Sequence, residues 1–243
     1  MPYRQSQQIQ SEDGVYIMPN WCNNSFELIG EKEQIDAFEN FLNGGNGKDW
    51  FNFFSATPEE LTDTTSPNRD AKSAEALREK YGASDWYEWN LSNWGCKWNC
   101  DANDWCRNGP NSISFWFDSP WGPPVRLYER ISEGEFGEGL DVIASYHEEG
   151  MAFVGEFFDG FDSCYEYSDL ESLDEIPDSL INEWNLREML EERAEWEEQE
   201  ALEEEMLEED ESEEASEEDM IEALDELKKE FDVMMKNEKE SKK

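Results

Sequence analysis

Residues 21–29 show the period of two that is typical of a half-buried strand. Phe26 and Leu28 alternate with Glu27, and Gly30 follows as a break. We therefore predict a strand that ends before Gly30. The same alternation, or a hairpin signal, predicts further strands at 112–118, 140–147, 151–158 and 161–167, the last two joined by Asp159-Gly160.

A period of three to four residues predicts helices between these strands. Ile35, Phe38 and Phe41 fall on one helical face, and the glycines at 44 and 45 favour the end of that helix. A short helix is predicted to start at Thr57, and longer ones at 71–81 and from Pro123 through Ile131. Another helix, with Ser84 as its cap, carries Trp86 and Trp89. Two segments have weaker patterns, so we predict a short second strand at 50–54 and a polar loop at 99–110.

The order of these elements is βαββαβ followed by a hairpin. This order predicts an α+β fold, a ferredoxin-like sandwich with a helical insertion at about 55–95. Thirty of the 33 Phe, Trp and Tyr residues precede residue 171, which is enough apolar surface for one core of about 150 residues. We therefore expect an N-terminal extension at 1–17, one domain at 18–170, and an acidic, helical or partly disordered tail at 171–243.

The charge of the chain excludes two classes of partner. Its 243 residues include 62 Asp and Glu against 19 Lys and Arg, a net charge of −43, whereas binding to a nucleic-acid backbone requires a basic face. No apolar run approaches the roughly 18 to 20 residues that span a bilayer, and 1–17 has no apolar core of a signal peptide. We therefore expect a cytoplasmic protein that binds neither nucleic acid nor membrane directly.

Five tracts rich in tryptophan carry a family resemblance. They are M-P-N-W-C-N-N at 18–24, Y-G-A-S-D-W-Y-E-W at 81–89, N-W-G-C-K-W-N at 93–99, F-D-S-P-W-G-P-P at 117–124 and E-G-M-A-F-V-G at 149–155. Together they resemble the hallmark tracts of the YubB-like ferredoxin-like domain family of plasmid and bacteriophage proteins. The resemblance covers about 18–160 and implies a ferredoxin-like fold and an origin on a mobile element, whose product works in the host cytoplasm. It implies no activity, because none is established for the family.

The tryptophans and one lysine between 86 and 98 have two interpretations. They form an aromatic and cationic pocket that stacks a base or nucleotide, or they fill the interface between sheet and helices, which is the commoner use of such rings. Tyr87 lies in the same tract. On the first interpretation, the ligand-binding residues are Trp21, Asn23, Trp86, Trp89, Trp94, Lys97, Trp98 and Trp121.

Metal binding and catalysis have weaker support. The residues available as soft metal ligands are Cys22, Cys96, Cys100, Cys106, Cys164 and His147. The spacing C-x3-C-x5-C lacks the C-x2-C pair of structural zinc sites, so we expect free thiols and no cofactor, with zinc as the alternative. His147 is the only histidine, and no nucleophile elbow, phosphate loop or H-E-x-x-H occurs, so we do not expect an enzyme.

The acidic tail is the most distinctive segment, with 31 acids and 8 bases in residues 171–243. We expect it to bind a basic host or phage protein, one that itself binds nucleic acid, as a DNA mimic or anti-defence factor. The expected partner-binding residues are Glu191, Glu192, Glu203, Glu204, Glu208, Glu209, Asp210, Met220, Leu224, Leu227 and Phe231. The alternatives are a solubilising extension and a component of the virion or its assembly.

Overall fold

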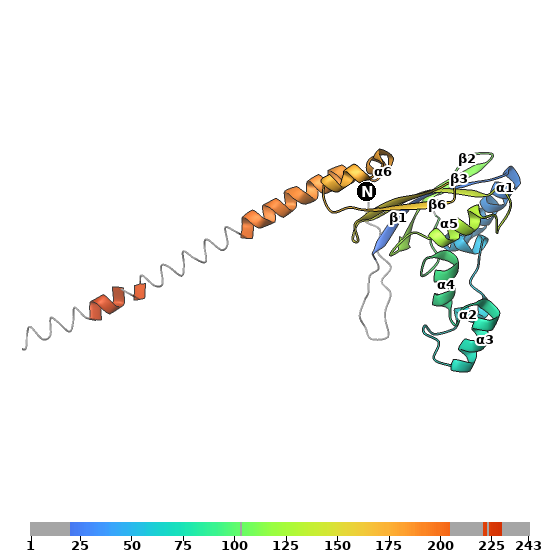
Figure 1. Ribbon diagram of the computed structural model, residues 1–243, viewed down its shortest axis with the longest axis horizontal. Coiled ribbons are helices and arrows are strands. Elements are labelled where there is room, and N and C mark those ends of the chain that lie inside the picture. The colour runs from blue at the N-terminus through green and yellow to red at the C-terminus, as the bar shows by residue number, and fades with distance from the viewer. Residues whose placement is uncertain (1–19, 103, 205–220, 223, 230–243) are drawn as a thin grey trace, which may run out of the picture. The chain divides into compact units, whose positions relative to one another are not determined.

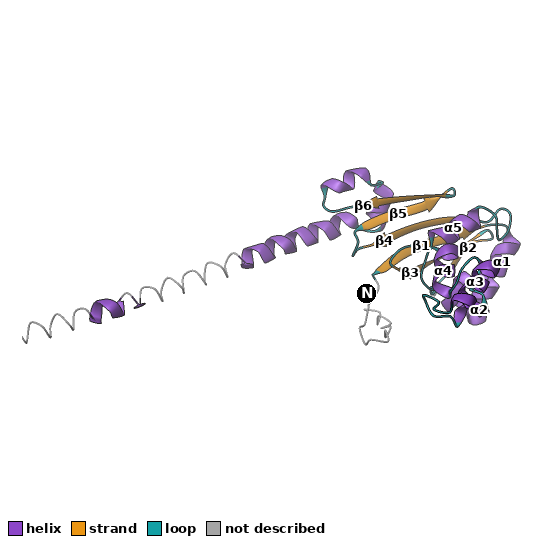
Figure 2. Ribbon diagram, turned by 60° about the horizontal axis from the view of Figure 1, so that its bottom comes forward, coloured by secondary structure: helices purple, strands orange, loops and turns teal. Residues whose placement is uncertain are grey.

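The structure, a computed structural model, describes residues 20–102, 104–204, 221–222 and 224–229. It has a mixed α+β fold whose open sheet has the order β2-β3-β1-β4-β5-β6, with all neighbours antiparallel (Figure 2). The strands are β1 (Trp21–Ile29), β2 (Cys106–Gly109), β3 (Ser112–Pro120), β4 (Asp141–Glu148), β5 (Phe153–Phe158) and β6 (Phe161–Glu166). All five strands predicted from a clear alternation or hairpin signal are confirmed.

Helices occupy the connections and follow the sheet (Figure 1). They are α1 (Lys32–Phe41), η1 (Leu42–Asn46), η2 (Gly47–Phe53), α2 (Glu59–Thr62), α3 (Ala71–Tyr81), α4 (Trp86–Trp94), α5 (Val125–Ser132), η3 (Glu171–Glu175) and α6 (Asp178–Glu183). The prediction for α3 is confirmed at both ends. Asp70 caps it by accepting from the N–H groups of Lys72 and Ser73, and Gly82 ends it with a φ of 75°.

The prediction of a second strand at 50–54 is wrong, because most of this segment belongs to the 3-10 helix η2. In a strand, Trp50, Asn52 and Phe54 would share one face, and burying that face would bury the Asn52 amide. The helical conformation instead buries Trp50, Phe51 and Phe54 and leaves Asn52 exposed. Burial of three aromatic rings therefore outweighs the local strand propensity of this segment.

The second strand of the sheet is β2, which lies in the segment predicted as a polar loop. β2 is an edge strand of four residues, and neither of its faces is buried, so the sequence has no period-two signal there. Pairing with β3 holds it in place. The Arg107 guanidinium also ties it to α1 through ion pairs with Asp36 and Glu39.

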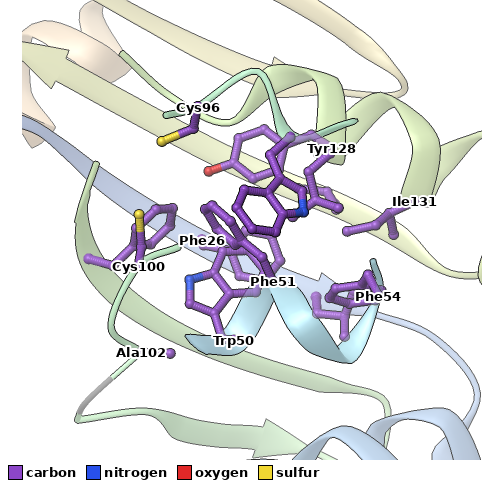
Figure 3. Packing of buried hydrophobic residues seen from close by; sticks show 14 of the residues in the cluster. Phe26, Trp50, Phe51, Phe54, Cys96, Cys100, Ala102, Tyr128 and Ile131 are labelled. Carbon is purple, nitrogen blue, oxygen red and sulfur yellow. The ribbon is translucent and has the colours of Figure 1, made fainter. Parts of the chain in front are cut away.

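One face of the sheet packs against η2, α1, α4 and α5 through a core of aromatic rings (Figure 3). The Trp50 ring centroid lies 4.8 Å from that of Phe26, 5.2 Å from that of Phe115 and 5.3 Å from that of Phe117. Tyr128 of α5 approaches Phe26 to 5.6 Å. These edge-to-face and tilted contacts join η2 to β1 and β3, and α5 to β1.

The segment with η3 and α6 covers part of the opposite face. Because side chains alternate along a strand, Trp116 and His147 point away from the aromatic core. Trp184, directly after α6, contacts both rings, with centroid distances of 5.3 and 5.7 Å. The first of two compact units accordingly continues to Leu186, beyond the domain end expected at residue 170.

The second unit begins at Arg187, and residues 187–204 form a continuous helix. Every residue from 191 to 204 is exposed. Residues 221–222 and 224–229 are also helical. Within the part of the chain that the structure describes, no helix is both long enough and apolar enough to span a membrane.

Gly155 of β5 packs so closely against Tyr146 that no side chain fits there. A Cβ atom at this position would collide with the Tyr146 hydroxyl group and lie 2.5 Å from the Ser163 carbonyl oxygen. We expect Gly155→Ala to lower the free energy of unfolding by about 1–3 kcal/mol, measured by denaturant titration. Gly109→Ala is the control, because its Cβ would meet open space. Equal stability of the two variants would contradict this account.

Candidate functional site

Part of the tryptophan-rich tract gathers around Lys97. The Lys97 Nζ atom lies 4.9 Å from the ring centroids of Trp98 and Trp121 and 5.9 Å from that of Tyr87. Trp98 also contacts Trp121 and Trp21 edge to face, at centroid distances of 5.4 and 6.5 Å. These five residues are here called the Lys97 cluster; four of them are half-buried, and Tyr87 is exposed at the edge.

Three predicted ligand-binding tryptophans of α4 lie elsewhere. Trp89 and Trp94 are buried in the aromatic core, where their rings pack edge to face at 5.6 Å. The Trp94 indole N–H donates to the Ser55 carbonyl at 2.8 Å. Trp86 is half-buried and packs against the same core. For these three residues the core-packing interpretation describes the structure.

Asn23 of β1, the strand that carries Trp21, forms a polar pair with Asp118 of β3. The two residues are directly opposite on β1 and β3, and Asn23 Nδ2 donates to Asp118 Oδ1 at 2.8 Å. Asn23 was a predicted ligand-binding residue, whereas Asp118 was not. Trp21 shares a strand face with Asn23, because the two residues are two positions apart. The pair therefore continues the polar surface beside Trp21.

Hydrogen bonds to the main chain hold the loop that carries Lys97 and Trp98. Asn90 of α4 donates to the Lys97 carbonyl at 2.8 Å. The thiols of Cys96 and Cys100 both donate to the Trp98 carbonyl, at 3.4 and 3.7 Å. Two of the three cysteines in the C-x3-C-x5-C pattern, Cys96 and Cys100, thus hold this loop through their thiols. Nothing in the sequence indicated the role of Asn90, because a buried asparagine such as this one cannot be told from an exposed helical asparagine by sequence alone.

Trp121 has an unusual backbone conformation. Its φ of 63° lies in the left-handed region, which costs a residue other than glycine about 1–2 kcal/mol. The Trp121 N–H donates to the Asn20 carbonyl at 2.8 Å. Buried Asn24 donates to the Ser119 hydroxyl, which donates in turn to the Gly122 carbonyl at 2.7 Å. These bonds hold the turn that presents the Trp121 ring.

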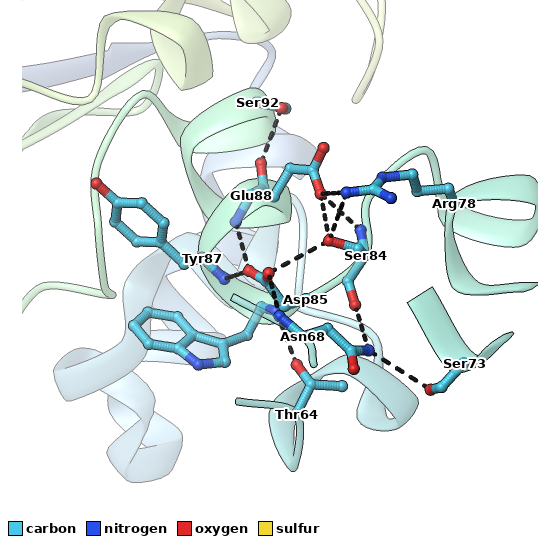
Figure 4. A network of polar contacts seen from close by, with 10 residues as sticks. Thr64, Asn68, Ser73, Arg78, Ser84, Asp85, Tyr87, Glu88 and Ser92 are labelled. Carbon is cyan, nitrogen blue, oxygen red and sulfur yellow. Dashed lines mark hydrogen bonds and ion pairs between the residues drawn. The ribbon is translucent and has the colours of Figure 1, made fainter. Parts of the chain in front are cut away.

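A polar network fixes the first turn of α4 and with it Tyr87 (Figure 4). Asp85, and not Ser84 as predicted, caps this helix by accepting from the N–H groups of Tyr87 and Glu88 at 3.1 and 3.0 Å. Ser84 instead donates its hydroxyl and N–H to the Glu88 carboxylate. These bonds, and the charge of Arg78, hold the pKa of Glu88 below its usual range.

The cysteines divide into two groups. Cys22, Cys96 and Cys100 are buried, whereas Cys106 and Cys164 are exposed on β2 and β6. Burial raises the pKa of the Cys22 and Cys100 thiols. Among the described residues, no group of three or more His, Cys, Asp or Glu side chains is arranged to hold a metal ion.

The predicted partner-binding residues are only partly described. Glu191, Glu192, Glu203 and Glu204 lie on the exposed part of the helix at 187–204. Leu224 and Leu227 are also helical and exposed. Outside the described residues lie Glu208, Glu209, Asp210, Met220 and Phe231.

Comparisons with known proteins identify no family. No protein-family model and no curated protein matches the chain. Among solved structures, a crystal structure of a protein api92 from Yersinia pseudotuberculosis, assigned to the family model DUF1281, is weakly similar. The alignment covers 62% of this chain and 98% of that one, with 13% identity and a TM-score of 0.32. We infer neither fold nor function from a likeness of this strength.

His147, the only histidine, is buried away from the aromatic core. Its Nε2 lies 2.6 Å from the Tyr167 hydroxyl oxygen, and its ring stacks on Tyr167. Burial lowers the pKa of His147 from 6.5 to about 4. The imidazole is therefore neutral at pH 7.

The low pKa of His147 makes stability depend on pH. Between pH 6.5 and 4 the unfolded chain binds the proton and the folded chain does not, so the free energy of unfolding falls as pH falls. We expect wild type to lose about 2 kcal/mol more than His147→Gln between pH 7 and pH 4.5. Denaturant titration of both proteins at both pH values measures this difference. Parallel losses would show that His147 already titrates normally.

Proposed function

We propose that this chain is a non-enzymatic accessory protein of a bacteriophage or another mobile element. It works in the host cytoplasm, where its acidic C-terminal helix binds a basic protein that normally binds DNA. By occupying the DNA-binding surface, the chain counters a host defence. The observation that carries this proposal is the fully exposed, glutamate-rich helix at 191–204.

The exposed helix has a charge density similar to that of a DNA strand. Residues 191–204 include eight glutamates and one arginine, a net charge of −7 in 14 residues. At 1.5 Å per residue the segment is about 21 Å long, so it carries one negative charge in about 3 Å. A DNA strand carries one in about 3.4 Å. A surface that binds a phosphate backbone therefore meets a similar spacing of charge here.

The same charges favour a basic partner energetically. Glu191 and Glu195, like Glu200 and Glu204, are four residues apart, and like charges at this spacing each destabilise a helix by a few tenths of a kcal/mol. Within this segment Arg193 forms an ion pair with Glu197, at 3.6 Å. Lysines and arginines of a partner would relieve the repulsion between the glutamates and steer the encounter.

Apolar side chains accompany the charge. Trp196 is 63% exposed and Leu202 is 55% exposed on the same helix. Large solvent-exposed apolar side chains on an otherwise charged helix are typical anchors of an interface. Tryptophan is among the residues enriched at binding hot spots. We propose that these two residues supply the apolar contacts of the complex.

We also propose that β1 to β4, α1 and α5 form a ferredoxin-like βαββαβ unit. The strand order β2-β3-β1-β4 supports it, as do the positions of α1 between β1 and β2 and of α5 between β3 and β4. In this proposal α2, α3 and α4 are an insertion, and the β5–β6 hairpin is an addition at one edge. Of the tracts that resemble the YubB-like family, 117–124 lies in this unit, 81–89 and 93–99 lie in or next to the insertion, and 149–155 leads into the added hairpin.

The charge contribution can be tested with two variants of equal net charge. In one, Glu191, Glu192, Glu203 and Glu204 become Gln. In the control, the exposed Glu33, Glu59, Glu75 and Glu79 of the first unit become Gln. We expect wild type and control to capture the same basic protein from a bacterial lysate, and the first variant to bind that purified protein at least tenfold more weakly at low salt.

Two further outcomes decide whether binding is mimicry. A DNA duplex should compete with the chain for the captured protein, and affinity should fall steeply as salt rises. Equal loss of affinity in both glutamine variants would mean that only net charge matters. Simultaneous binding of duplex and chain to the partner would exclude mimicry.

The apolar contribution is tested separately by Trp196→Ala. Alanine has a higher helix propensity than tryptophan, so helix content measured by circular dichroism should be retained. Affinity for the captured partner should nevertheless fall at least tenfold, because the complex loses the aromatic anchor that the partner would bury. The conservative variant Trp196→Phe should retain most of the affinity. Unchanged binding by Trp196→Ala would restrict the interface to charge.

A further inference from the structure

The Lys97 ammonium forms no ion pair with an acidic side chain in the described part of the chain, although acids outnumber bases by 62 to 19 in the sequence. Ring faces of Trp98, Trp121 and Tyr87 surround the ammonium group instead. Aromatic faces stabilise the positive charge but accept its N–H groups poorly, so these donors remain available to an anion.

The Lys97 cluster is arranged before any ligand binds. Bonds from Asn90, Cys96 and Cys100 fix the main chain of Lys97 and Trp98. A ligand therefore does not have to order this loop, and the entropic cost of binding is correspondingly smaller.

Trp121 provides a second, independent observation. Glycine would adopt its φ of 63° without strain, whereas tryptophan does so at a cost in stability. Strained residues of this kind concentrate at binding sites, where the fold holds a side chain that the backbone alone would not favour. Here the strain places an indole ring against Lys97, at 4.9 Å from its Nζ.

The geometry of the rings leaves room for stacking. Trp98 meets Trp21 at an interplanar angle of 68° and Trp121 at 64°. In an edge-to-face pair, the ring that presents its edge keeps both of its faces free of its partner. Since the three indoles are only half-buried, a planar ligand can stack on a free face.

We propose that the Lys97 cluster binds a planar aromatic anion, specifically a nucleoside 5′-monophosphate. The phosphate accepts hydrogen bonds from the Lys97 ammonium, and the base stacks on a tryptophan of the cluster. A single cation matches a single phosphate group, which favours a mononucleotide over a nucleic-acid strand. A strand would place further phosphates against a chain with a net charge of −43.

The test uses the full chain and four mononucleotides, AMP, GMP, CMP and UMP, in calorimetric titrations. We expect at least one of them to bind at least tenfold more tightly than either its nucleoside or inorganic phosphate, because each of these lacks one half of the recognition. Affinity should not fall as salt rises, since the overall field of the chain repels the ligand. The absence of binding by all four at millimolar concentration would overturn the proposal.

Two variants assign the binding to the cluster. Lys97→Met keeps the length of the side chain and removes its charge, and should weaken binding at least tenfold, while Lys48→Met, at an exposed lysine of η2, should not. Trp121→Gly relieves the backbone strain, so it should fold, but it should also lose affinity. If Lys97→Met does not fold, Trp121→Gly still decides the question. Wild-type affinity in a folded variant of either residue would overturn the assignment.

Discussion

The contact between Trp50 and Phe26 is the interaction on which the other parts of the first unit depend. It holds η2 on the central strand β1, and Phe51, next to Trp50, then packs against Trp94 at 5.2 Å. Trp94 ends α4, and the Lys97 loop follows it directly. A line of packed rings thus runs from the centre of the sheet to Trp94, three residues before Lys97. Displacing η2 would move the cluster as well as loosen the core.

The sequence predicted elements wherever one face is buried and the other is exposed. That condition holds for β1 and α3, whose bounds follow from residue period and from a terminal glycine. The condition fails for β2, which has no buried face. It also fails for η2, where aromatic residues are buried on more than one side, so neither a period of two nor a helical period appears. The extent of the first unit was also underestimated, because burial of α6 depends on a sheet face that no local pattern reveals.

The candidate site was predictable in composition but not in geometry. Trp21, Lys97, Trp98 and Trp121, which only the ligand-binding interpretation grouped, lie together although they come from three separate tracts. Trp89 and Trp94 belong to one of the same tracts, yet they face the core. A tryptophan suits both a core and a half-buried surface, so only the direction of each side chain distinguishes the core tryptophans from those of the cluster. The supporting bonds from Asn90 and Asn24 required the fold itself.

The two proposed surfaces have opposite electrostatic requirements, and the chain keeps them on different units. The buried thiols beside the Lys97 cluster add a practical consequence. Cys106 and Cys164 are open to a thiol reagent in the folded protein, whereas Cys22, Cys96 and Cys100 are not. Cys96 and Cys100 also donate hydrogen bonds to the Trp98 carbonyl. A reagent can therefore reach these two thiols only when the loop that carries Lys97 and Trp98 moves. The count of labelled sulfurs, two when the cluster is closed and four when Cys96 and Cys100 also react, therefore distinguishes a closed cluster from an open one.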